Sequence, residues 1–430
     1  MDYDLAVIGA GWAGFNAAVK ARDLGLKVCL IDKGPLGGVC LNYGCIPTKT
    51  LIHCAKLYSL SIKSEIFGVK NIETKLDFPK MVARKNTVIK QLQSGIQFML
   101  KGVELISSHA ALVSNQEVAL ADKNIKVKSI LIATGSQAQE IPDFKFGGKI
   151  VSSNEILDLE NIPKKLFIIG GGVIGCEFAS LFSALGAKVT IVEKLSRLLP
   201  SEDEEISRKM ESIFKKKGIL VNTNYQAKKE DADNYDLVLV AVGRIPITDN
   251  LGLDKVGIKL EKKAISVDGF LKTNIENIYA AGDCTGQVML ANFAAHQGMI
   301  AANNIACPDK LKKMPQHNVA SCIFTDPEVA AVGLSEDEVK WKGINFRINK
   351  FYFLGSGMAR ITEEIEGFVK IISNQDTGEV LGASIIGPRA TELINILTLA
   401  VSAGLKVSQV ADAVFAHPTF SESIGDALKN

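Results

Sequence analysis

Two cysteines five positions apart are the part of this sequence best suited to chemistry. Cys40 and Cys45 lie in the segment 37–49, Gly-Gly-Val-Cys-Leu-Asn-Tyr-Gly-Cys-Ile-Pro-Thr-Lys. A zinc site usually takes cysteines roughly two to four residues apart and needs four ligands, so this spacing favours a local disulfide. Stabilising disulfides are rare in cytosolic proteins, and a strained disulfide in a short loop is more often redox-active. Spacing alone leaves open the alternative of two buried free cysteines.

The size and composition of the chain exclude several function classes. Its 430 residues are more than one hydrophobic core can hold, and this length predicts about three domains. With 49 basic and 47 acidic residues the net charge is +2, which indicates neither a nucleic-acid nor a membrane partner. The segment 166–187 is nearly all apolar, but its triple glycine and Glu177 favour a strand, a turn and a helix over a membrane span. Because the acidic N-terminus lacks signal-peptide features, we expect a soluble, cytoplasmic protein, and no metal site.

A strand, a glycine-rich turn, a helix and a second strand that ends in an acid occur twice in the chain. The turns are the segments 9–14 (Gly-Ala-Gly-Trp-Ala-Gly) and 170–175 (Gly-Gly-Gly-Val-Ile-Gly). A single GxGxxG pattern is weak evidence, because a glycine-rich chain can contain it by chance. Here Asp32 and Glu193 each follow the first glycine of their copy by the same 23 positions. The repeat therefore predicts two dinucleotide-binding units.

Each part of the repeat has a physical role toward a dinucleotide. The first glycine permits a tight turn, the second lets the backbone approach a pyrophosphate, and the third lets the helix pack on the strand. The helix N-terminus faces the phosphate charge, and the acid accepts hydrogen bonds from ribose hydroxyls. A carboxylate at Glu193 repels a 2′-phosphate and favours NAD over NADP, a preference that the following Lys194 and Arg197 soften.

Three further apolar segments end in glycine turns late in these units. They are 130–135 (Ile-Leu-Ile-Ala-Thr-Gly), 237–244 (Leu-Val-Leu-Val-Ala-Val-Gly-Arg) and 278–283 (Ile-Tyr-Ala-Ala-Gly-Asp). The last places Asp283 at the end of a strand, where a ligand crevice opens in parallel sheets. The alternative for Asp283 is a simple turn-forming residue.

These motifs together resemble the pyridine nucleotide-disulfide oxidoreductases, the flavoprotein family that contains dihydrolipoyl dehydrogenase, glutathione reductase and mercuric reductase. The most specific parts are the segments 37–49, 280–283 (Ala-Ala-Gly-Asp) and 417–422 (His-Pro-Thr-Phe-Ser-Glu). The resemblance implies an α/β fold with two Rossmann-like dinucleotide-binding domains and a C-terminal α+β dimerisation domain. The implied domains are an FAD-binding domain at 1–148 completed by 266–314, a shortened NAD-binding domain at 149–265 and an interface domain at 315–430.

The resemblance also implies which residues hold the two cofactors. Those expected at FAD are Gly9, Gly11, Gly14, Asp32, Thr134, Gly135 and Asp283. Those expected at NAD are Gly170, Gly172, Gly175, Glu193 and Gly243. Lys49 would lie beside the flavin and pair with Glu177, since either charge buried alone would cost several kcal/mol. The alternative is a solvated lysine and a glutamate on a helix surface.

Catalytic roles follow from the same resemblance. Cys45 would be the thiolate next to the flavin, and Cys40 the thiol that exchanges with substrate. His417 would be the acid-base group, since histidine titrates near neutrality, with Glu422 orienting its ring. The segment 419–422 also fits an S/T-x-x-E capping box, which would leave Glu422 a structural role only. His417 is far from Cys40 in sequence, and in the family the second subunit of a homodimer supplies it.

Within the family the chain is most similar to dihydrolipoyl dehydrogenase. The expected function is electron transfer between dihydrolipoyl groups and NAD, and the expected partners are a second copy, a dihydrolipoyl group or another small disulfide, and a 2-oxo acid dehydrogenase complex. NADH-dependent reduction of another disulfide or of a metal ion is the alternative, and a flavin-binding scaffold without turnover is a third class. Two departures bear on this choice. A short polar segment at 222–235 stands in for a longer β-meander, and 291–298 lacks the Ala-His followed by acids of lipoyl enzymes.

Overall fold

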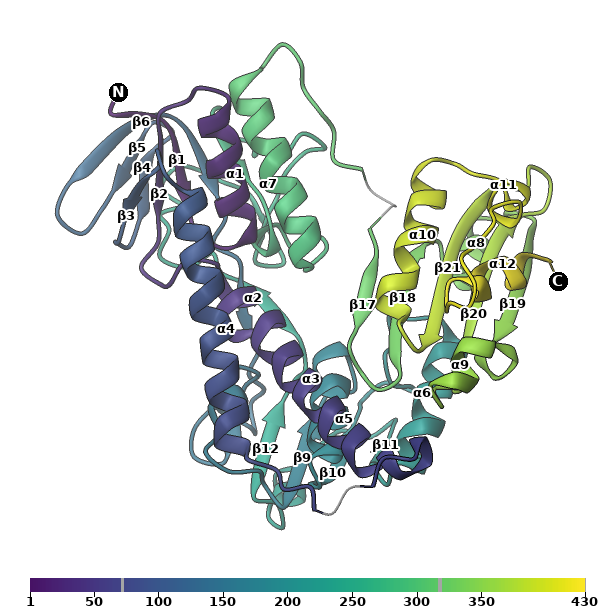
Figure 1. Cartoon of the computed structure of the whole chain (residues 1–430). Helices are drawn as coiled ribbons and strands as arrows, with labels where there is room; N and C mark the ends of the chain where they lie inside the picture. The colour runs from purple at the N-terminus through teal and green to yellow at the C-terminus, as the bar shows by residue number, and fades with distance from the viewer. Residues whose placement is uncertain (71–72, 316–318, 430) are drawn as a thin grey trace.

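The computed structural model describes residues 1–70, 73–315 and 319–429, which form three units (Figure 1). The first unit contains the N-terminus, and a later part of the chain that includes α7 (Ala291–Ala306) also belongs to it. The second contains β9 (Lys165–Ile169) and its neighbours, and the third contains the C-terminus. The predicted fold class, two nucleotide-binding units and a C-terminal α+β domain, is confirmed.

The sheet of the first unit has the strand order β3-β2-β1-β6-β5-β4. Strand β16 pairs with the C-terminal end of β6, at residues 130–132. Strands β1, β2, β3, β6 and β16 run parallel, whereas β4 and β5 add an antiparallel extension. The strand bounds are β1 Tyr3–Ile8, β2 Val28–Ile31, β3 Glu104–Ile106, β4 Ala111–Ser114, β5 Glu117–Ala119, β6 Asn124–Ile132 and β16 Ile278–Ala280. The central strands are buried apolar runs, as expected for parallel strands covered on both faces.

Two alanine-rich helices lie side by side against this sheet, α1 (Trp12–Asp23) and α7 (Figure 1). The small buried side chains of Ala13 and Ala17 on α1 and of Ala294 on α7 allow their close approach. The cysteine segment forms α2 (Gly38–Tyr43) and α3 (Cys45–Ile62), and α4 (Phe78–Met99) packs along α3.

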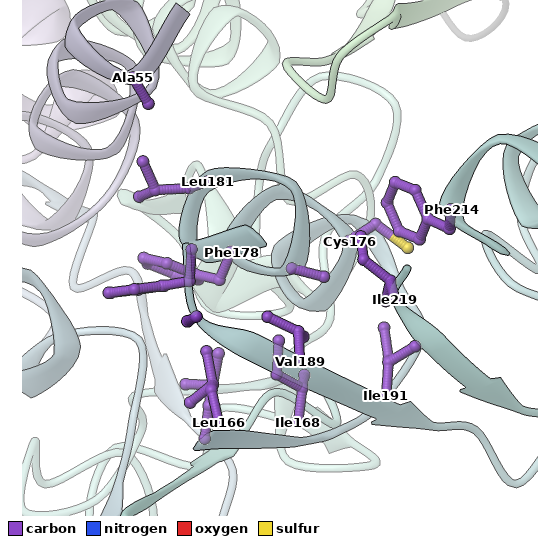
Figure 2. Close-up of a cluster of buried hydrophobic side chains, with 14 of the residues drawn as sticks. Ala55, Leu166, Ile168, Cys176, Phe178, Leu181, Val189, Ile191, Phe214 and Ile219 are labelled. Carbon is purple, nitrogen blue, oxygen red and sulfur yellow. The ribbon is translucent and has the colours of Figure 1, made fainter. Parts of the chain in front are cut away.

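The second unit has an all-parallel sheet with the order β11-β10-β9-β12-β8. Its elements are β8 Ile150–Val151, β9, α5 Val173–Ala184, β10 Lys188–Val192, α6 Glu204–Lys216, β11 Leu220–Asn222 and β12 Leu237–Val240. Figure 2 shows α5 over this sheet, with Phe178 and Leu181 between the strands and Ala55 of α3. The apolar segment 166–187 is thus a strand, a turn and a helix, as predicted. Among the described residues no helix is both long and apolar enough to cross a bilayer.

The short segment between β11 and β12 contains a single turn of 3-10 helix, η3 (Lys229–Ala232). It covers the face of the sheet opposite α5, where the Tyr235 ring lies 4.9 Å from that of Phe167 and its hydroxyl donates to Thr190. A two-stranded antiparallel ribbon of β7 (Ser136–Ala138) and β13 (Arg244–Pro246) connects the first and second units.

The C-terminal unit is an antiparallel sheet with the order β17-β18-β21-β20-β19. Its elements are β17 Ser321–Ile323, β18 Glu328–Gly333, α8 Glu336–Trp341, β19 Phe346–Tyr352, η5 Phe353–Gly355, α9 Gly357–Ile361, β20 Phe368–Asn374, β21 Val380–Gly387, α10 Ala390–Ser402, α11 Val407–Ala411 and α12 Glu422–Lys429. Helix α10 buries Leu393, Ile394 and Leu397 on the sheet, while Leu399 is 67% exposed.

Gly175 shows how closely α5 packs on its own strand. A Cβ atom at this position would lie 1.9 Å from the carbonyl oxygen of Gly170, so Gly175→Ala must push the helix off the turn. We expect the substitution to lower the free energy of unfolding by about 1–3 kcal/mol, as overpacking does, measured by urea denaturation.

Gly95→Ala is the matched control for this variant. Gly95 is exposed inside α4, and a Cβ there would meet no atom within 4 Å. Alanine should therefore stabilise this helix by about 0.5–1 kcal/mol. Equal unfolding midpoints for the two variants would contradict the steric explanation.

Candidate active site

The two predicted redox cysteines meet where α2 turns into α3. Cys40 is the third residue of α2, Cys45 is the first of α3, and Gly44 separates the two helices. Both cysteines are free and partly buried, and their thiols hydrogen-bond each other. The structure therefore brings together the two cysteines of the predicted redox pair.

The two thiols are electrostatically unequal. The hydrogen bond from Cys40 lowers the pKa of Cys45 to about 7, and the ammonium of Lys49 also favours its thiolate. The same hydrogen bond and burial raise the pKa of Cys40. Of the two thiols, Cys45 is therefore the one that ionises more readily, with its thiolate accepting a hydrogen bond from the Cys40 thiol.

The predicted ion pair between Lys49 and Glu177 is present. Lys49 Nζ lies 2.8 Å from Glu177 Oε2, and Glu177 is buried on α5. The other carboxylate oxygen accepts the backbone N–H of Phe324 at 2.8 Å, and the ammonium lies 5.0 Å from the centre of the Phe324 ring. The alternative of a solvated lysine and a surface glutamate is wrong. No sequence pattern indicated Phe324 as the third partner.

Both acids of the repeat hold their own glycine turn in the same way. Asp32 accepts the N–H of Ala10 at 2.6 Å and that of Gly34 at 2.7 Å. In the second copy Glu193 accepts two equivalent N–H groups, from Gly171 at 2.6 Å and from Leu195 at 2.7 Å. Each carboxylate oxygen keeps a further lone pair, so binding of a ribose hydroxyl remains compatible with these bonds.

The first glycine turn fits the pyrophosphate of FAD. Helix α1 begins without a side-chain cap, so its first N–H groups are available to an anion. A Cβ at Gly11 would meet only Gly38, at 4.0 Å, which leaves a space of the kind a phosphate needs.

Near this turn, Asp283 Oδ2 lies 2.5 Å from the Ser136 hydroxyl. The neighbouring Gly135 accepts the backbone N–H of Ile247, and the Thr134 hydroxyl donates to Ile247. The predicted strand ends therefore meet at one place.

The second turn opens into a cavity of about 790 Å³. Predicted residues that line it are Gly170, Gly172, Glu193 and Gly243. No atom lies within 4 Å of a Cβ built at Gly172, and α5 also lacks a side-chain cap, so the cavity fits a dinucleotide pyrophosphate. Gly175 lies behind the turn and serves the packing of α5 instead.

Two residues near the cysteines were missed by sequence analysis. The indole nitrogen of Trp12, inside the first glycine turn, is buried without a hydrogen-bond partner and lies close enough to Cys40 to favour its thiolate. Arg244 donates to the hydroxyl and the carbonyl of Ser136, at 2.8 and 2.6 Å. Burial lowers the pKa of Arg244, while Asp283 and Cys45 oppose that shift. The place of Arg244 after the 237–243 strand was the one available signal.

His417 and Glu422 form the predicted contact, since His417 Nδ1 lies 2.8 Å from Glu422 Oε1. Glu422 Oε2 accepts the backbone N–H of Thr419 at 2.9 Å, and this bond and His417 lower the pKa of Glu422. The carboxylate thus serves both the ring and the chain before α12. The imidazole is 80% exposed, and in Figure 1 α12 lies at the right-hand edge, well separated from α2 in the middle of the molecule. One copy of the chain does not bring His417 to Cys40.

Two family models match the chain. Residues 3–298 match the model described as pyridine nucleotide-disulphide oxidoreductase, and residues 319–428 match the model of its dimerisation domain.

The similar proteins agree with these matches. The dihydrolipoyl dehydrogenases of Zymomonas mobilis and Bacillus subtilis are 36% and 38% identical, each over 99% of this chain and 97% of the relative. Among solved structures, the HOCl-induced flavoprotein disulfide reductase RclA of Escherichia coli has a TM-score of 0.90 at 30% identity, with 99% of each chain covered. RclA has also been solved as a Cu(II) complex, and LpdA of Mycobacterium tuberculosis has a TM-score of 0.91 at 29% identity and the same coverage. This chain belongs to the pyridine nucleotide-disulphide oxidoreductases, enzymes that use FAD and NAD, and it carries their dimerisation domain.

Proposed function

We propose that this protein is a homodimeric dihydrolipoyl dehydrogenase, which passes electrons from dihydrolipoyl groups through the Cys40–Cys45 pair to NAD. When bound, FAD supplies the electron transfer between the cysteine pair and NAD. Relatives with this name cover nearly the whole chain. The single observation that carries the proposal is the geometry of the site, in which Cys40 and Cys45 meet at the junction of α2 and α3, and Lys49 of α3 pairs with Glu177.

Thiol exchange would leave the two thiols of the pair unequally ionised. A substrate thiolate attacks the sulfur of Cys40 in the oxidised pair, so that a mixed disulfide forms and Cys45 leaves as a thiolate. The second substrate thiol then loses its proton to a base and attacks the substrate sulfur of the mixed disulfide. The lipoyl disulfide closes, and Cys40 leaves and takes up that proton. The final state, a Cys40 thiol beside a Cys45 thiolate, has the ionisation that the pKa shifts favour.

We assign the proton transfer to His417 of the second copy in the dimer. The imidazole is exposed and held by Glu422, which suits a group that reacts with a site outside its own chain. The dimerisation domain contains it. The proposed dihydrolipoyl donor is a group of a 2-oxo acid dehydrogenase complex, and the proposed compartment is the cytoplasm, where thiols stay reduced.

Reduction of a metal ion is the second candidate, favoured by the Cu(II) complex of RclA. The described residues of one copy contain no group of three or more His, Cys, Asp or Glu side chains that could hold a resident metal ion. Reduction of another small disulfide by NADH uses the same thiols and differs only in substrate.

A side-by-side assay separates these substrates. We expect the highest kcat/KM for dihydrolipoamide with NAD, compared with glutathione disulfide, Cu(II) or mercuric ion with NADH. The variant Cys45→Ser should lose activity toward every disulfide or dithiol while it still binds flavin. Faster turnover of glutathione disulfide or of a metal ion would replace the proposed substrate but leave the family assignment intact.

Heterodimers test the origin of the histidine. Cys40→Ser and His417→Gln copies, co-expressed with different tags and purified through both, should recover about half of wild-type activity, since one of the two shared sites is then intact. Each homodimer should lose at least about 100-fold, the range of acid-base catalysis. If His417 acted within its own chain, no heterodimer site would be intact and no activity would return.

The charge of Lys49 should set the ionisation of Cys45. The pKa of this thiol is about 7, so its thiolate is lost as the pH falls through that value. In Lys49→Met the midpoint should rise by about one unit or more, because a nearby cation is removed. The measurement is a pH titration of thiolate absorbance in the reduced protein.

Two further variants control this titration. Glu177→Gln removes a carboxylate that raises the pKa of Cys45, so its midpoint should shift to lower pH. Lys56→Met, farther along α3, should leave the midpoint unchanged. A shift in the same direction for the Lys49 and Glu177 variants would contradict the electrostatic explanation.

A further inference from the structure

The wall of the NAD cavity beside Glu193 comes from the short segment between β11 and β12. Tyr225, Gln226 and Ala227 line the cavity together with Glu193 and Leu195. The N–H of Tyr225 donates to the carbonyl of Glu193 at 2.9 Å, so the two residues are direct neighbours. Because the acid of a Rossmann unit binds the adenosine ribose, Tyr225 flanks the adenosine end of the cavity.

The side chain of Tyr225 is fixed by the segment itself. Its hydroxyl lies 2.9 Å from both carboxylate oxygens of Asp231. One of these oxygens also accepts the N–H of Lys228 at 2.8 Å, which caps η3. The carbonyl of the buried Ala232 accepts Lys149 Nζ at 2.8 Å, which ties the end of η3 to the start of β8. The tyrosine is therefore clamped between the end of β10 and an anchored turn.

An aromatic residue, Tyr225, and an aliphatic residue, Leu195, border this end of the cavity. The ring of Tyr225 is partly exposed, and Leu195, the second residue after Glu193, is 53% exposed. A purine base offers a flat π face that packs on aromatic and aliphatic groups, and such stacking does not need hydrogen-bonded base recognition. Lys194 and Glu193 lie at the same end, where the ribose belongs.

We propose that Tyr225, held by Asp231, packs against the adenine ring of NAD and is the positioning residue for the adenosine half of the cofactor. In this chain a clamp of one tyrosine and one aspartate closes the cavity where the connection between β11 and β12 is short. This proposal rests on the assignment of the cavity to NAD and not on the proposed dihydrolipoyl substrate.

The test is equilibrium binding to the flavin-loaded, full-length protein, measured by calorimetry with three probes: NAD, ADP-ribose and nicotinamide mononucleotide. Tyr225→Ala should weaken NAD and ADP-ribose equally, by roughly 5- to 100-fold, the range of one base stack. Nicotinamide mononucleotide, which lacks adenine, should bind unchanged. Asp231→Asn keeps the ring but loosens the clamp, so it should give the same pattern with a smaller loss, about 2- to 5-fold.

Tyr235→Phe is the matched control. Tyr235 belongs to the same segment, but its hydroxyl bonds Thr190 and its ring packs on Phe167, away from the cavity lining. It should leave the affinity for all three probes unchanged. Unchanged ADP-ribose binding in both Tyr225→Ala and Asp231→Asn, or an equal loss for nicotinamide mononucleotide, would overturn the proposal. Substrate assays play no part in this test, so it stands or fails separately from the proposed function.

Discussion

The buried carboxylate of Glu177 holds all three units at one point. One oxygen accepts a hydrogen bond from the ammonium of Lys49, on helix α3 of the first unit. The other accepts the backbone N–H of Phe324, which follows β17 in the third unit. Removing one partner of a buried ion pair typically lowers the stability of a protein by about 3–5 kcal/mol, because the remaining charge stays buried without a partner or water. The same lysine favours the thiolate of Cys45. Domain arrangement and thiol chemistry therefore depend on the same two charges.

The two nucleotide units share the same arrangement of acid, glycine turn and helix, but the surroundings of the two turns differ. In each, an acid at the end of the second strand binds the glycine turn through two backbone N–H groups, and an uncapped helix faces the phosphate position. The first turn is closed in by the neighbouring helix α2, whereas the second opens into a cavity. Such surroundings suit a cofactor that stays bound at the first turn and one that exchanges at the second.

Sequence predicted the features that depend on local pattern, and missed those that depend on distant contacts. The glycine repeats and the strand ends were predicted because their spacing carries them, whereas the pairing of Lys49 with Glu177, a distant contact, was predicted only from the family resemblance. The roles of Trp12 and Arg244 were not, because tryptophan in a glycine turn and arginine after a strand have no spacing rule. Tyr225 was hidden for a similar reason, since only the folded segment brings this residue to the cavity.

The third unit is fixed to the second by buried charges, and this bears on how a dimer completes the site. Lys370 is 1% exposed and binds Asp203, just before α6, and Glu336 of α8, at 2.8 and 2.5 Å. Lys217 adds a contact from the end of α6 to Asp326. The Asp326 N–H also donates to Ser180 on α5. Because α5 also carries Glu177, these contacts lie near the ion pair of Glu177 and Lys49. These contacts therefore attach the unit that carries His417 to the second unit, whose helix α5 carries Glu177, the partner of Lys49. The proton transfer that we propose for His417 therefore requires two copies that dock in one defined arrangement, which brings this histidine to the cysteine pair of the other copy.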